Sequence, residues 1–219
     1  MENRERAEQS CLLLHDLTAT ERQMEDLCRA LEGRGYPVGV PNLHGYAPKG
    51  EYDRTPMWQR WLEIAQEAYV QLRRISEGVT VIGAGYGGSI ATVLAEQYSA
   101  DGLVVLGSVA RPVALAGRLR RWIPFLPLEG ADKGISALDA GRLIRLADNN
   151  LFSILAPVLV IQAMGDPAFS PRGGEALLAG VRSKRKQALE VEGATVRDMC
   201  ADYAVEIRGA VLDFLSGKE

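Results

Sequence analysis

The chain has 219 residues, a formal net charge of −3, and 47% hydrophobic and 24% charged residues. These values are typical of an ordinary globular protein and exclude a disordered or fibrous chain. The small negative charge gives no reason to expect nucleic acid or an anionic membrane surface as a partner.

The cysteines and histidines are few and widely spaced. Cys11, Cys28 and Cys200 form no CxxC or Cys/His cluster, so we expect no disulfide framework, structural metal or other cofactor. The charged first residues do not resemble a secretory signal, and no apolar run approaches the roughly 18 residues of a membrane span. We therefore expect a soluble, cytoplasmic protein. Its histidines are His15 and His44, so any mechanism that needs an imidazole must use one of them.

Short apolar runs alternate with longer amphipathic segments. Most of the runs are continuous stretches rich in leucine and β-branched residues, typical of strands buried on both faces. They are Ser10–His15, Pro37–Pro41, Val79–Ala84, Gly102–Gly107, Pro157–Ala163 and Gln187–Val191.

The segments between the runs show helical spacing of apolar residues, and Thr20 with Gln23 predicts a capping box at the start of the first helix. The alternation predicts an α/β fold, with a mostly parallel central sheet of about six strands and helices on both faces. We expect one domain over residues 1–219.

Residues 111–150 interrupt this alternation, because no clear strand lies between the two candidate strands that flank them. An insertion at the end of a strand where α/β sheets bind ligands is typical of a cap or lid. A packing helix preceded by a long loop is an equally good interpretation. Arg118, Arg120 and Arg121 in this segment are candidate contacts to a protein partner.

The turn after the third run is rich in glycine. Gly83–Gly88 matches the dinucleotide motif GxGxxG. However, two strand–helix units precede it, and the next run, Gly102–Gly107, does not end in the acidic residue that would bind a ribose. Dinucleotide binding is therefore the lesser alternative. The same turn has the frame of a nucleophile elbow, Gly-x-Ser-x-Gly, with Gly85 in place of the serine.

Further motifs, in the same order along the chain, resemble the α/β-hydrolase superfamily, in particular its small carboxylesterases and monoacylglycerol lipases. CLLLHDLTAT, residues 11–20, resembles the strand that leads into the oxyanion loop of that family. APVLVIQAMGDPAFSP, residues 156–171, resembles the strand that ends at the catalytic acid, which places that acid at Asp166. Residues 193–215 resemble the segment that carries the catalytic histidine and the last helix.

This chain departs from that resemblance at the catalytic positions. Gly85 stands where the nucleophilic serine would be, and Ala194 (or its neighbour Thr195) stands where the histidine would be. Of the triad only the acid, Asp166, is present. Triad hydrolysis needs a nucleophile and a base that takes its proton. The sequence therefore predicts a degenerate triad without the usual esterase activity.

The oxyanion loop departs as well, because Asp16 replaces the glycine that follows the family's histidine. By position, the backbone donors would come from Leu17 and Tyr86, and they could bind a carbonyl or carboxylate. A negative charge at Asp16 would oppose a developing oxyanion if its side chain faced the cleft. Ser108 could border the same cleft. We expect these residues, with Asp166, to line a ligand site.

Two functional hypotheses follow besides dinucleotide binding. The first is a non-hydrolytic homologue, a pseudoenzyme, that binds a small acyl or ester-like ligand in the cleft or a protein partner through the cap. The second is an active carboxylesterase-like hydrolase in which Asp166 acts as base to water, with His15 or Tyr86 assisting. His15 and His44 are otherwise expected to be structural.

Overall fold

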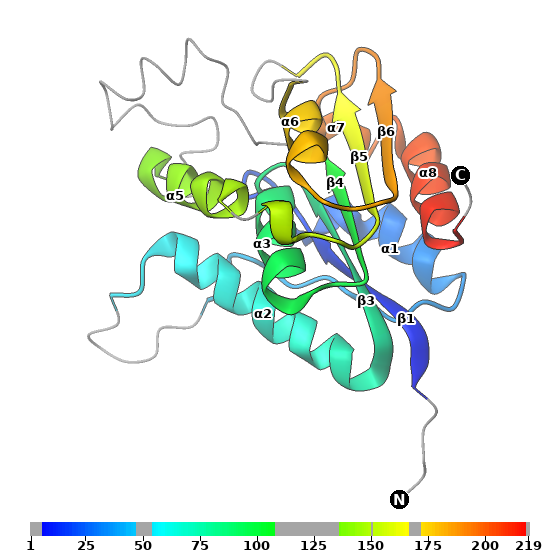
Figure 1. Ribbon diagram of the computed structural model, residues 1–219, viewed down its shortest axis with the longest axis horizontal. Coiled ribbons are helices and arrows are strands. Elements are labelled where there is room, and N and C mark those ends of the chain that lie inside the picture. Colours follow the sequence, from blue (N-terminus) through cyan, green and yellow to red (C-terminus); the bar gives the residue numbers. More distant parts are fainter. Residues whose placement is uncertain (1–5, 47–53, 108–135, 150, 167–171, 218–219) are drawn as a thin grey trace, which may run out of the picture.

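A six-stranded parallel sheet forms the centre of the molecule (Figure 1). The computed structural model describes residues 6–46, 54–107, 136–149, 151–166 and 172–217. The strands lie in the order β2-β1-β3-β4-β5-β6, and every neighbouring pair is parallel. They are β1 Ala7–Leu14, β2 Val38–Gly39, β3 Ser76–Ala84, β4 Gly102–Leu106, β5 Val158–Ala163 and β6 Lys186–Val191. The predicted sheet is confirmed, with strand limits that differ by a few residues.

Helices cover both faces of this sheet, as the alternating pattern predicted (Figure 1). On one face α1 (Glu25–Glu32) contacts α8 (Ala204–Leu215). On the other lie α2 (Met57–Ile75), α3 (Tyr86–Tyr98), α5 (Ala137–Asp148) and α6 (Arg172–Gly180). Three short helices complete the described elements: η1 (Glu21–Met24), η3 (Leu151–Ser153) and α7 (Val196–Met199). None of the helices in the described part of the chain is both long and apolar enough to cross a membrane.

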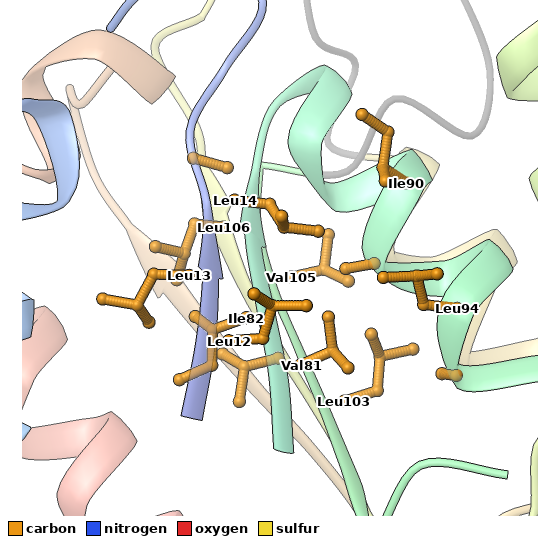
Figure 2. Packing of buried hydrophobic residues seen from close by; sticks show 14 of the residues in the cluster. Leu12, Leu13, Leu14, Val81, Ile82, Ile90, Leu94, Leu103, Val105 and Leu106 are labelled. Atoms are coloured by element: carbon orange, nitrogen blue, oxygen red, sulfur yellow. The ribbon is translucent and has the colours of Figure 1, made fainter. Parts of the chain in front are cut away.

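The core lies on both faces of the central strands. On one face, Figure 2 shows side chains of these strands, among them Leu14 and Val105, beside Ile90 and Leu94 of α3. On the other face, Leu13 lies away from α3, and buried residues of α1 and α8 belong to the same cluster. All residues of β4 and β5 are buried, as expected for strands covered on both faces. β6 differs from these strands, because exposed residues alternate with half-buried ones over most of its length. The reason is its position at the edge of the sheet, where less of the strand is covered.

The segment 111–150 is described only over residues 136–149, which include α5. This helix packs on α2 and α3 through a face that includes Ala140, Leu143 and Ala147. Arg118, Arg120 and Arg121 lie outside the described residues, and the cap stays a prediction.

The predicted capping box does not form. Thr20 precedes η1, but its side chain makes no capping hydrogen bond. The side chain of Gln23 instead accepts a hydrogen bond of 2.7 Å from the backbone N–H of Asp16. A tertiary contact has thus taken the group that the local motif would have used, and this contact lies at the candidate site.

Candidate functional site

The turn between β3 and α3 has the backbone of a nucleophile elbow. Gly85 joins the two elements with φ +52° and ψ −122°, and its N–H donates to the carbonyl of Leu106 at 2.9 Å. A residue with a side chain is strained at this positive φ, whereas glycine adopts it freely. The turn therefore keeps the conformation that would present a nucleophile, but Gly85 has no side chain to act as one.

The neighbouring glycines allow α3 to approach the sheet closely. A Cβ atom on Gly87 would lie 2.4 Å from the carbonyl oxygens of both Leu14 and His15. No side chain fits at that distance. Close packing thus accounts for a glycine in this turn without any bound dinucleotide.

Asp16 lies directly over the elbow and is 4% exposed. Its Oδ1 accepts a hydrogen bond of 2.9 Å from the backbone N–H of Tyr86. Its Oδ2 accepts from the N–H of Thr18 at 3.2 Å and from the hydroxyl of the same residue. A Cβ atom on Gly85 would lie only 2.4 Å from Oδ1. The carboxylate therefore occupies the place of a nucleophilic side chain and uses the N–H that the resemblance assigns to the oxyanion hole.

His15 holds the backbone of this loop in place. Its Nδ1 bonds to the carbonyl of Asp16 at 2.8 Å, and its Nε2 bonds to the N–H of Leu43 at 3.1 Å. A carbonyl can only accept and an N–H can only donate, so His15 is neutral with its proton on Nδ1. Burial also lowers the pKa of this imidazole, consistent with the neutral form.

These bonds leave His15 without a free nitrogen to act as a general base. The structural interpretation of His15 is the one that the hydrogen bonds support. The ring of His44 lies beside it, with 5.5 Å between the ring centroids, and the His44 residue is exposed.

Asp166 follows β5 and lies beside the segment that would carry the catalytic histidine. Its Oδ2 accepts a hydrogen bond of 2.8 Å from the N–H of Val196. The N–H of Gly165 donates to the carbonyl of Ala194 at 2.9 Å. The fold therefore brings the acid position and the histidine segment together, but with a backbone amide as the partner of the carboxylate.

The two positions considered for the histidine differ in their surroundings. Ala194 is fully buried. Thr195 is half-buried and caps α7, where its hydroxyl donates to a carboxylate oxygen of Asp198 at 2.7 Å. An imidazole has more room at position 195.

Gln23 connects these two halves of the site. Its Oε1 accepts from the N–H of Asp16 at 2.7 Å, and its Nε2 donates to the carbonyl of Val196 at 3.5 Å. A chain of hydrogen bonds thus runs from Asp166 through Val196 and Gln23 to Asp16 and then to Tyr86. These hydrogen bonds connect the positions that the resemblance assigns to the acid, the histidine and the oxyanion hole.

The other predicted site residues lie as follows. Leu17 is fully buried, and Tyr86 is 7% exposed, so little of its side chain faces solvent. Ser108 lies outside the described residues. Burial, together with the charge of Asp16, raises the pKa of the Cys200 thiol to about 12.

Sequence reasoning missed Thr18 and Val196 as partners of the two carboxylates, and Gln23 as the partner of the Asp16 backbone N–H. An Asp-x-Thr sequence, in which the aspartate side chain bonds two residues on, is the signal that could have found Thr18. Gln23 and Val196 had no such local signal.

The described residues around the turn were compared with what a cation or a nucleotide would need. Among the described residues, no three His, Cys, Asp or Glu side chains gather as metal ligands. A pyrophosphate at Gly83–Gly88 would need N–H groups at the start of α3. Asp16 already binds the N–H of Tyr86 there, and its negative charge would repel a phosphate.

The chain was compared with protein-family models, curated proteins and solved structures. No protein-family model matches the chain. A thermostable monoacylglycerol lipase of Bacillus sp. (strain H-257) is 23% identical over 201 residues, which cover 84% of this chain and 80% of the lipase.

Among solved structures, a metagenome-derived lipolytic enzyme from a study of LipS and LipT superposes with a TM-score of 0.78 at 19% identity, covering 96% of this chain and 94% of the other. The monoacylglycerol lipase of Paleococcus ferrophilus gives 0.72 at 21% identity over 96% of each chain. The enol-lactonase of Burkholderia xenovorans LB400 gives 0.65 at 18% identity over 98% of this chain and 94% of the other. The chain therefore has the α/β-hydrolase fold, and the proteins that it resembles are lipases and esterases of that superfamily.

Proposed function

We propose that this chain is a non-hydrolytic α/β-hydrolase-fold protein whose function is binding. The observation that carries the proposal is the state of the elbow. Gly85 keeps the positive φ of a nucleophile position but supplies no nucleophile, and the carboxylate of Asp16 lies 2.4 Å from where its Cβ would be.

Among the described residues, His15 and Asp166 do not form a substitute for the triad. Acyl transfer needs a nucleophile, a base to deprotonate it and donors for the oxyanion. His15 is the buried one of the two histidines, and both of its ring nitrogens are bonded to backbone groups. Asp166 has an acid's position without the imidazole that an acid would orient, and it bonds a backbone amide there.

The binding role that we propose is for a small acyl or ester-like ligand, or for a protein partner at the 111–150 segment. Because Asp16 already uses the Tyr86 N–H, a ligand carbonyl would have to be held by other contacts. A thermal-shift titration with 1-monobutyrin tests the ligand. A concentration-dependent rise in the unfolding temperature supports it, and an unchanged temperature leaves the partner as the proposed role.

The absence of hydrolysis is tested with p-nitrophenyl butyrate and the full chain. The expected rate is that of buffer alone, with no change on Asp166→Asn. This variant is a fair control, because the asparagine carbonyl can still accept the hydrogen bond from Val196. Turnover that Asp166→Asn abolishes would overturn the proposal and support the alternative in which Asp166 acts as base to water.

A further inference from the structure

We propose that Asp16 is a blocking residue: its carboxylate occupies the oxyanion hole and keeps carbonyl and carboxylate ligands out of that hole. This inference goes beyond the proposed function, which rests on missing catalytic groups. Here a group that is present forms an additional barrier, which would persist if serine and histidine were restored.

A ligand in the oxyanion hole would compete with Asp16 for one hydrogen-bond donor. A backbone N–H has one proton to donate, and the N–H of Tyr86 donates it to Oδ1 of Asp16 at 2.9 Å. Tyr86 directly follows the elbow residue and starts α3. An oxyanion or a ligand carbonyl at this place would have to displace Asp16 first.

Hydrogen bonds hold both the carboxylate and the backbone of Asp16 in place. Thr18 donates to Oδ2 from both its N–H and its hydroxyl. The N–H of Asp16 is bonded to Gln23, and its carbonyl is bonded to buried His15. Because the backbone on either side of the Cα atom is fixed, the carboxylate has little freedom to leave the hole.

Asp16 also opposes a serine at position 85 and a negative charge on a substrate, by its volume and by its own charge. A Cβ atom at position 85 would lie 2.4 Å from Oδ1 and 2.8 Å from Cγ of Asp16, so a serine there would compete with the carboxylate for space. A negative charge that developed on the substrate would also lie beside a carboxylate that is 4% exposed and thus poorly screened by water. Both effects oppose the tetrahedral intermediate of acyl transfer.

The direct test follows the amide signal of Tyr86 in ¹⁵N–¹H spectra during titration with sodium butyrate. We expect no movement in the native protein and a saturable movement in Asp16→Gly, where the N–H is free for the added carboxylate. Asp139→Ala removes a carboxylate from the first turn of another helix, α5, and should behave as the native protein does. Equal responses of the native protein and Asp16→Gly, whether both move or neither moves, would overturn the proposal.

A second test restores the triad. The variants Gly85→Ser/Thr195→His and Gly85→Ser/Ala194→His are compared with the same pairs carrying Asp16→Gly. Loss of one oxyanion donor costs about 10²–10³ in kcat, so Asp16→Gly should raise the burst rate of p-nitrophenol release by at least about 100-fold. A burst of equal rate with and without Asp16 counts against a blocking role.

The butyrate titration needs no catalytic activity, so it decides the proposal even if the restored variants are inactive. The results of the titration can also be told apart from those that test the proposed function. Hydrolysis by the native chain would overturn the proposed function, whereas an effect of Asp16 on the Tyr86 amide would be unaffected by it.

Discussion

The contact between Asp16 and the elbow predicts that substitutions at positions 16 and 85 are strongly coupled in their effect on stability. The perturbation is a double-mutant cycle built from Gly85→Ala, Asp16→Gly and the two together. Alanine is chosen because it adds only the Cβ atom, which would lie 2.4 Å from Oδ1 of Asp16.

The magnitude follows from two separate costs of Gly85→Ala. Placing a non-glycine residue in a sparsely populated region such as φ +52° costs about 1–3 kcal/mol. Displacing the carboxylate from the Tyr86 N–H loses a hydrogen bond to a charged group, which contributes about 1.5–3 kcal/mol. In the native background we therefore expect Gly85→Ala to lower the free energy of unfolding by about 4 kcal/mol.

In the Asp16→Gly background only the backbone cost of the alanine remains. We therefore expect a coupling free energy of about 2 kcal/mol, with the double variant more stable than the sum of the single effects implies. The conformational cost of the glycine at position 16 appears in both arms and cancels.

The assay is equilibrium unfolding in urea, followed by circular dichroism and by tryptophan fluorescence. Coincident transitions establish that the two-state analysis applies to this chain. Gly141→Ala on α5 serves as the matched control for Gly85→Ala, because nothing lies within 4 Å of its added Cβ atom. Its effect should add to that of Asp16→Gly.

The reasoning is refuted if Gly85→Ala and Asp16→Gly are additive within about 0.5 kcal/mol, as substitutions at independent sites are. That result would mean that the carboxylate moves aside at no cost and does not hold the elbow.

Three further predictions concern groups around the site. Burial lowers the folded-state pKa of His15, so the unfolded state binds more protons as the pH falls below the ordinary histidine value of about 6.5. The contribution of neutral His15 to stability is therefore complete above that pH and is lost as the pH falls below it. His15→Asn should flatten the decline in the free energy of unfolding, measured in urea, between about pH 7 and pH 5. Burial raises the pKa of the Cys11 and Cys200 thiols to about 12, and it also raises the pKa of the Cys28 thiol. Cys11 is buried, whereas Cys28 and Cys200 are half-buried, so Ellman's reagent should modify Cys11 last in the native protein and all three cysteines after unfolding. Equal rates for the three in the native protein would contradict the burial of Cys11. Gln23→Ala should lower the free energy of unfolding by about 1–2 kcal/mol, because the buried N–H of Asp16 loses its acceptor. Gln23→Glu keeps an acceptor and should lose less in the same urea assay.

Much of the fold could be predicted because it depends on patterns that are local in sequence. A strand buried on both faces is apolar at most of its positions, and runs such as Val79–Ala84 and Pro157–Ala163 meet that condition, with Thr80 and Gln162 as their buried polar residues. The edge position of β6 could not be predicted in this way, because strand order depends on long-range packing. The capping box failed for the same reason, since Gln23 found a partner in Asp16 rather than in its own helix.

The sequence by itself determined where an imidazole can lie in this chain. A histidine can occupy only the positions where the chain has one, and His15 and His44 both precede the elbow at Gly85. Tertiary structure alone decided where the carboxylate of Asp16 goes. Residues 16 and 86 are 70 positions apart, and only the parallel pairing of β1 with β3 brings the ends of these strands together. Hydrogen bonding acts over about 3 Å in space, whatever the separation along the chain. The absence of a histidine after His44 can therefore be read from the sequence, but the hydrogen bond from the Tyr86 N–H to Asp16 could not be predicted from it.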